Sequence, residues 1–116
     1  MHKPFPSNMI TVKCEFEVNG WDVKLRGKAT PPVGDSTEIT IYIELKPTLG
    51  DDYPAVLRQM KANSRDTDRY DRRVLLFDRF TTEQVTLEQV KAIFKASGFT
   101  VLVLDDIVPV TVITPA

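Results

Sequence analysis

The strongest constraint on this chain is the alternation of apolar and polar residues that begins near its N-terminus. In 12–18 the even positions are apolar and the odd positions are charged, and Asn19-Gly20 follows directly. Alternation with a period of two is typical of a half-buried strand. Asn-Gly favours a type I′ turn, in which both central residues take positive φ. The sequence therefore predicts a β-hairpin, with a second strand over 21–29.

A third strand is predicted over 38–46, after a turn-forming stretch at 30–36. Isoleucine and leucine fill its odd positions, and polar residues or tyrosine fill its even ones. Pro47 is expected to end the strand because it has no N–H group for the ladder. The first three strands together predict an antiparallel meander with one apolar and one polar face.

The second half of the chain changes to helical spacing. We predict a helix that begins at 51–54 with an aspartate cap, followed by a charged loop over 64–73. A strand over 73–77, buried on both faces, comes next. A second helix is predicted from the capping box Thr86–Gln89 to Gly98, and a last strand over 99–104. The expected fold is α/β (α+β), with a mixed sheet in which the meander is followed by β-α-β-α-β. Both crossovers should be right-handed.

Composition narrows the classes of protein that fit. The 116 residues carry 15 Lys and Arg against 16 Asp and Glu, which excludes binding to nucleic acid through bulk charge. We predict one domain over 1–116, with a loose N-terminus at 1–8 and an edge strand or interaction tail at 107–116. No run approaches the roughly 18 apolar residues of a membrane span, and no signal peptide is visible. The single cysteine and single histidine argue against zinc and favour a cytoplasmic location.

The turns also predict which residues face each other across the meander. A two-residue Asn19-Gly20 turn places Glu17 opposite Asp22. A second turn centred near Val33 places Asp22 opposite Glu44. Directly opposed residues have Cβ atoms roughly 4.5–5.5 Å apart. Three carboxylates are therefore expected in one row across three strands.

Such a row is unfavourable unless something neutralises it, because like charges directly opposite destabilise a sheet. A divalent cation removes the repulsion, and carboxylates favour Mg²⁺ or Mn²⁺. Lys46 lies two residues beyond Glu44 on the same face and could orient a water molecule or offset charge on a phosphate. We therefore predict a metal site formed by Asp22, Glu44 and Glu17, with Lys46 beside it.

Asp22 and the Glu44-Leu45-Lys46 triplet resemble the signature of the PD-(D/E)XK nuclease superfamily. The resemblance implies a restriction-endonuclease-like core, here lacking its first helix, and metal-dependent hydrolysis of phosphodiester bonds in DNA or RNA. It also implies that Asp22, Glu44 and the Leu45 carbonyl hold Mg²⁺ or Mn²⁺ and that Lys46 assists the attacking water. Gln59 corresponds to an accessory glutamine of some members.

Other interpretations remain open at this level. The polar face of the meander is equally typical of a solvated surface on a non-enzymatic domain that binds protein or nucleic acid. Asp105-Asp106, after a strand, is a possible small-molecule site. The charged loop 65–73 could contact a phosphate backbone or simply face water. A chain this short is expected to form a homo-oligomer or a protein complex, with the apolar segment 107–113 as the candidate contact.

Overall fold

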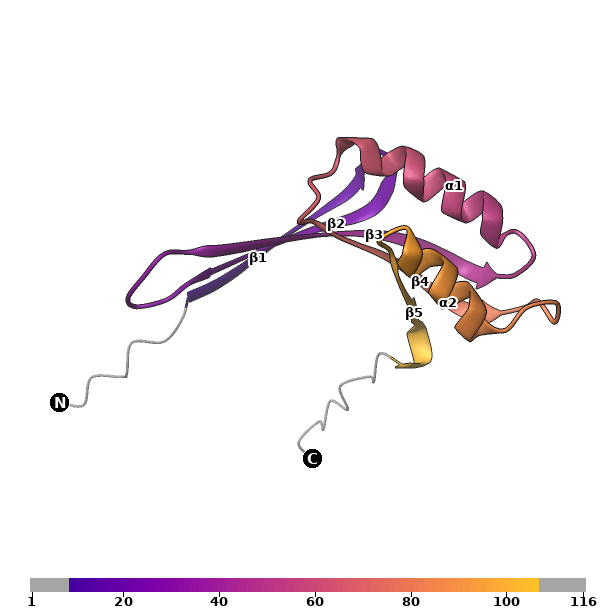
Figure 1. Cartoon of the computed structure of the whole chain (residues 1–116). Coiled ribbons are helices and arrows are strands. Elements are labelled where there is room, and N and C mark those ends of the chain that lie inside the picture. Colours follow the sequence, from indigo (N-terminus) through magenta and orange to yellow (C-terminus); the bar gives the residue numbers. More distant parts are fainter. Residues whose placement is uncertain (1–8, 107–116) are drawn as a thin grey trace, which may run out of the picture.

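The computed structural model of the chain describes residues 9–106. It is an α+β domain with one five-stranded mixed sheet and two helices (Figure 1). The elements are β1 (Met9–Val18), β2 (Trp21–Thr30), β3 (Thr37–Leu49), α1 (Tyr53–Asn63), a 3₁₀ turn (Ser64–Asp66), β4 (Arg72–Phe80), α2 (Leu87–Ala96), β5 (Thr100–Val103) and a second 3₁₀ turn (Leu104–Asp106). The loose N-terminus and the interaction tail expected at 1–8 and 107–116 lie outside the described residues. Neither helix in residues 9–106 is long and apolar enough to cross a bilayer.

The meander forms with the register that the turns predicted. Asn19 and Gly20 have φ of 52° and 86°, which is the left-handed backbone that a type I′ turn requires. Val18 pairs with Trp21 across this turn, and Val23 of β2 pairs antiparallel with Ile43 of β3. The sheet then continues in chain order, with β4 parallel to β3 and β5 parallel to β4.

Both helices pack on the same face of the sheet. The core is one cluster that joins helix residues to buried residues of β3, β4 and β5: Val56 and Met60 from α1, Val90 and Phe94 from α2, and Tyr42, Leu75, Phe77 and Val101 from the strands. Two crossovers that step in the same direction along a sheet place their helices on the same side when both are right-handed. This helix-covered face is the one that carries the polar positions of β3, among them Tyr42 and Glu44.

The opposite face of the sheet, here called the apolar back face, has no helix over it in the described structure. Val12, Phe16, Ile39 and Leu45 belong to it and are 68%, 71%, 53% and 44% exposed. The prediction that the strand at 73–77 is buried on both faces was therefore wrong. β4 alternates between buried residues on the helix side and half-buried ones on the back, because only one side of the sheet receives helices.

Two details of β3 and α1 also differ from expectation. Pro47 does not end β3, which runs to Leu49. The parallel ladder with β4 pairs Lys46 with Phe77 and Thr48 with Arg79 and skips Pro47, so the missing N–H does not end the strand.

Asp52 occupies the N-cap of α1, but its side chain makes no capping hydrogen bond, contrary to prediction. It accepts instead from the Gly50 N–H at 3.0 Å and stabilises the turn that precedes the helix. The capping box of α2 is confirmed, because Thr86 and Gln89 each accept from the other's backbone N–H.

Candidate functional site

Asp22, Glu44 and Lys46 come together where the pairing of β2 with β3 ends. The last ladder pair is Val23 with Ile43. Asp22 immediately precedes Val23 in β2. Its Oδ2 accepts a hydrogen bond of 2.7 Å from the backbone N–H of Leu45. This bond places the Asp22 carboxylate against β3 beside Glu44, as the register argument predicted for these two acids.

The Glu44 side chain is held out of water. Glu44 is 4% exposed, and its Oε2 is buried without a hydrogen-bond partner. Burial, followed by the negative charge of Asp22 and a hydrogen bond to that carboxyl group, raises the pKa of Glu44 from 4.5 to about 7, against a smaller opposing effect of Lys46. An unpartnered buried oxygen beside a second carboxylate fits a cation, which would favour the charged form.

Lys46 contributes the positive charge of the site. Its Nζ lies 3.9 Å from Glu44 Oε1, and its side chain is about a third exposed. That separation is too long for a direct hydrogen bond. The ammonium group therefore keeps its N–H donors available for a water molecule or a phosphate oxygen at the edge of the site.

The hairpin turn is fastened to α1, and this contact fixes the start of β2 over β3. Trp21 Nε1 donates to the Asn63 carbonyl at 3.2 Å, and Asn63 Nδ2 donates to the Gly20 carbonyl at 3.1 Å. A Cβ on Gly20 would lie 2.5 Å from Asn63 Oδ1. Glycine therefore suits this position for two reasons, its positive φ and its close approach to Asn63. Asp22 follows directly in the chain, and its position depends on this anchor.

The structure does not bring Glu17 to the other two acids. Glu17 is exposed and has φ of 53°, and the paired residues step from Phe16 to Val18 without it. Within residues 9–106 no group of three or more His, Cys, Asp or Glu side chains could hold a metal ion. Any cation at this site would therefore take two side-chain ligands from the chain, Asp22 and Glu44.

The other candidate residues lie apart from this site. Gln59 is exposed on α1, and no hydrogen bond joins it to the acids in the described region. Asp105 is exposed in the 3₁₀ turn after β5. Arg73, at the end of the stretch expected as a charged loop, lies in β4 and packs inward, with its guanidinium 5.5 Å from the Phe99 ring centre and a hydrogen bond to Thr67.

Sequence reasoning missed two features that define the site. It predicted Glu44 as a metal ligand on the polar face of the meander but did not predict that this residue would be buried. It also missed the contact of Trp21 and Asn63, which are 42 residues apart. The strong turn signal beside a tryptophan was the only local hint that this end of the hairpin is fixed.

Comparisons with protein-family models, with curated proteins and with solved structures found no match. Function is therefore inferred from the geometry of the site and from the residue pattern alone.

Proposed function

We propose that this protein is a metal-dependent nuclease that hydrolyses phosphodiester bonds in nucleic acid, with a site similar to that of PD-(D/E)XK enzymes. The observation that carries the proposal is the convergence of Asp22 and Glu44 beside Lys46, with one Glu44 oxygen buried and unpartnered. The order of strands and helices, β-β-β-α-β, supports the same assignment of the core.

Two carboxylates suit Mg²⁺ or Mn²⁺ when the substrate supplies further oxygens. Mg²⁺ is usually bound through one or two carboxylates together with water and substrate phosphates. A bound ion would supply Lewis-acid stabilisation of the phosphoryl group and acidify a coordinated water. Asp22 and Glu44 would hold this ion, and the hydrogen bond from the Leu45 N–H keeps the Asp22 carboxylate in place.

Lys46 positions the nucleophile in this proposal. An ammonium group has three donors and no acceptor, so it orients the attacking water by donating to its oxygen and offsets charge on a phosphate oxygen. Attack of the water oxygen on phosphorus breaks the ester bond to the leaving oxygen, and the proton that the water loses balances the proton that the leaving oxygen takes up from solvent. The two negative charges and the one positive charge of the site are thereby each assigned a role.

Cleavage of end-labelled DNA and RNA oligonucleotides with Mg²⁺ or Mn²⁺ tests the proposal. We expect cleavage that EDTA abolishes and that Lys46→Ala lowers by about 100-fold or more, the usual loss when one stabilising donor is removed. Lys95→Ala on α2 is the matched control and should cleave normally. Cleavage that persists in EDTA, or an unchanged rate for Lys46→Ala, would contradict it.

The apolar back face supports a second proposal, that two copies of the chain associate through it. Residues 39–45 extend about 23 Å along β3, and five strands span roughly 24 Å across, which gives at most about 550 Å² of flat area because β5 accompanies only the end of this stretch. This is of the order of the roughly 800 Å² of accessible surface that each partner buries in a standard interface. Two apolar sheet faces pack directly on each other in sandwich folds, so a second copy is a suitable occupant.

A further inference from the structure

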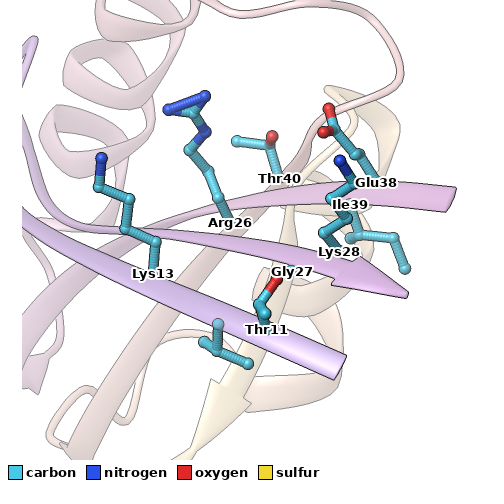
Figure 2. A pocket seen from close by; sticks show the side chains of 9 residues that line it. Thr11, Lys13, Arg26, Gly27, Lys28, Glu38, Ile39 and Thr40 are labelled. Atoms are coloured by element: carbon cyan, nitrogen blue, oxygen red, sulfur yellow. The ribbon is translucent and has the colours of Figure 1, made fainter. Parts of the chain in front are cut away.

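The outer half of the β1–β2–β3 ribbon carries a group of basic side chains outside the acidic site. The ribbon extends beyond the helices (Figure 1). Residues two apart in a strand share a face, so Lys24, Arg26 and Lys28 follow Asp22 along the same side of β2. The register places Lys13 of β1 beside Arg26. Figure 2 shows Lys13, Arg26 and Lys28 rising from the same side of the ribbon.

These side chains surround a shallow hollow of about 310 Å³. Its other lining residues include Thr11 and Thr40, whose hydroxyl groups are further hydrogen-bond donors. Lys13, Arg26 and Lys28 are all exposed. Thr40 stands opposite Arg26 on β3, so the hollow crosses three strands. Val12 and Ile39 also line the hollow, so it combines several outward-pointing donors with two apolar side chains.

The charge of this surface is opposite to that of the chain as a whole. Lys13, Lys24, Arg26 and Lys28 face two acids, Glu15 and Glu38, whereas the whole chain has a formal net charge of −1. Within residues 9–106 the one ion pair that involves these cations is Arg26 Nη1 with Glu15 Oε1 at 3.7 Å, and both side chains are partly exposed. Exposed pairs of this kind contribute little to stability, so a phosphate can readily displace Glu15.

We propose that this basic ribbon, defined as Lys13, Arg26 and Lys28, binds the phosphate backbone of a nucleic-acid strand and leads it to the Asp22–Glu44 site. The inference deepens the proposed nuclease function and rests on it. From Asp22 to Lys28 the strand rises about 20 Å at 3.4 Å per residue, which corresponds to roughly six nucleotides of a duplex strand. The donors are cationic and hydroxyl groups, which contact phosphate without reading bases. Binding is therefore expected to be independent of sequence.

Fluorescence anisotropy of labelled single-stranded and duplex oligonucleotides tests the inference. The full chain is titrated in EDTA, so that no cleavage competes with binding. We compare the wild type with the Lys13→Ala/Arg26→Ala/Lys28→Ala triple variant. We expect the triple variant to bind at least tenfold more weakly at low salt, and its plot of log K against log salt to be less steep by about 2 to 3, since each lost duplex phosphate contact contributes about 0.9.

The control is a triple variant with the same loss of charge, Lys61→Ala/Lys91→Ala/Lys95→Ala on the two helices. Its affinity for the oligonucleotide should be within about threefold of that of the wild type. Melting curves of both triple variants check that they fold. An equal loss of affinity in the two triple variants, or wild-type affinity in the ribbon variant, would overturn the inference. Displacement of the oligonucleotide by poly-glutamate at equal charge concentration would also overturn it, because the surface would then show no preference for nucleic acid over another polyanion.

Lys46→Ala separates this inference from the proposed function. It should lose cleavage, whereas its affinity for oligonucleotide should fall far less than that of the ribbon variant, which loses three cations. If Lys46→Ala cleaves normally but the ribbon variant still loses affinity, the nuclease site is wrong and the binding surface stands. If the ribbon variant cleaves short and long substrates as fast as the wild type, the binding surface is wrong and the nuclease site stands.

Discussion

Replacing Glu44 with glutamine should make the protein more stable at neutral and alkaline pH while it removes the cation site. Glu44 is 4% exposed and lies beside Asp22, and its pKa is raised from 4.5 to about 7. In the folded protein the neutral carboxyl group is therefore favoured. A glutamine remains neutral at every pH, so it places no second negative charge beside Asp22.

The size of the effect follows from the raised pKa. Because the folded pKa exceeds the unfolded one, the stabilising contribution is fully present below about pH 4.5 and is lost as the pH rises through about 7. At 1.36 kcal/mol per pKa unit, the free energy of unfolding of the wild type falls by about 3 kcal/mol over this range from Glu44 alone. Glu44→Gln avoids this loss, which corresponds to roughly 10 °C in melting temperature for a domain of this size.

Thermal and urea unfolding in EDTA from about pH 4 to about pH 8 checks this prediction. The difference in unfolding free energy between Glu44→Gln and the wild type should be near zero at the acid end and grow towards about 3 kcal/mol. Glu38→Gln is the matched control, since Glu38 is exposed on the same strand and should follow the wild type. Millimolar Mg²⁺ or Mn²⁺ should then stabilise the wild type but not Glu44→Gln. A flat difference across the whole pH range would refute the burial of Glu44 beside Asp22.

Two further predictions concern the fold and its assembly. Thr86→Ala should lower the unfolding free energy by about 1 kcal/mol in urea titrations, because it breaks the capping box at the start of α2; no loss would contradict the cap. Leu45→Lys, on the apolar back face, should convert a dimer to a monomer in sedimentation velocity. The control variant Lys95→Ala should sediment as the dimer, like the wild type. The experiment needs a reducing buffer because Cys14 is free and exposed and could form an intermolecular disulfide. A wild type that sediments as a monomer would refute self-association.

The local elements of this fold were predictable from the sequence because short-range chemistry determines them. Asn19-Gly20 dictated the hairpin turn and the pairing of β1 with β2, and the second turn, centred near Val33, set the register that placed Asp22 level with Glu44. The capping box at Thr86 began α2 at the residue expected. Pro47 misled the prediction of where β3 ends, since one missing N–H matters only at a position where the ladder needs it. Whether it does depends on β4, which lies some 30 residues further along the chain.

The sequence by itself determined which residue types could gather: two acids and one lysine on one side of a meander, with isoleucine and leucine on the other. The tertiary structure alone decided which side would be covered. Both helices packed on the polar side because both crossovers step the same way across the sheet, and this buried Glu44 and left the isoleucine-rich side open. The alternation of apolar and polar residues distinguishes the two faces of a strand. It does not indicate which face a helix from a distant part of the chain will cover.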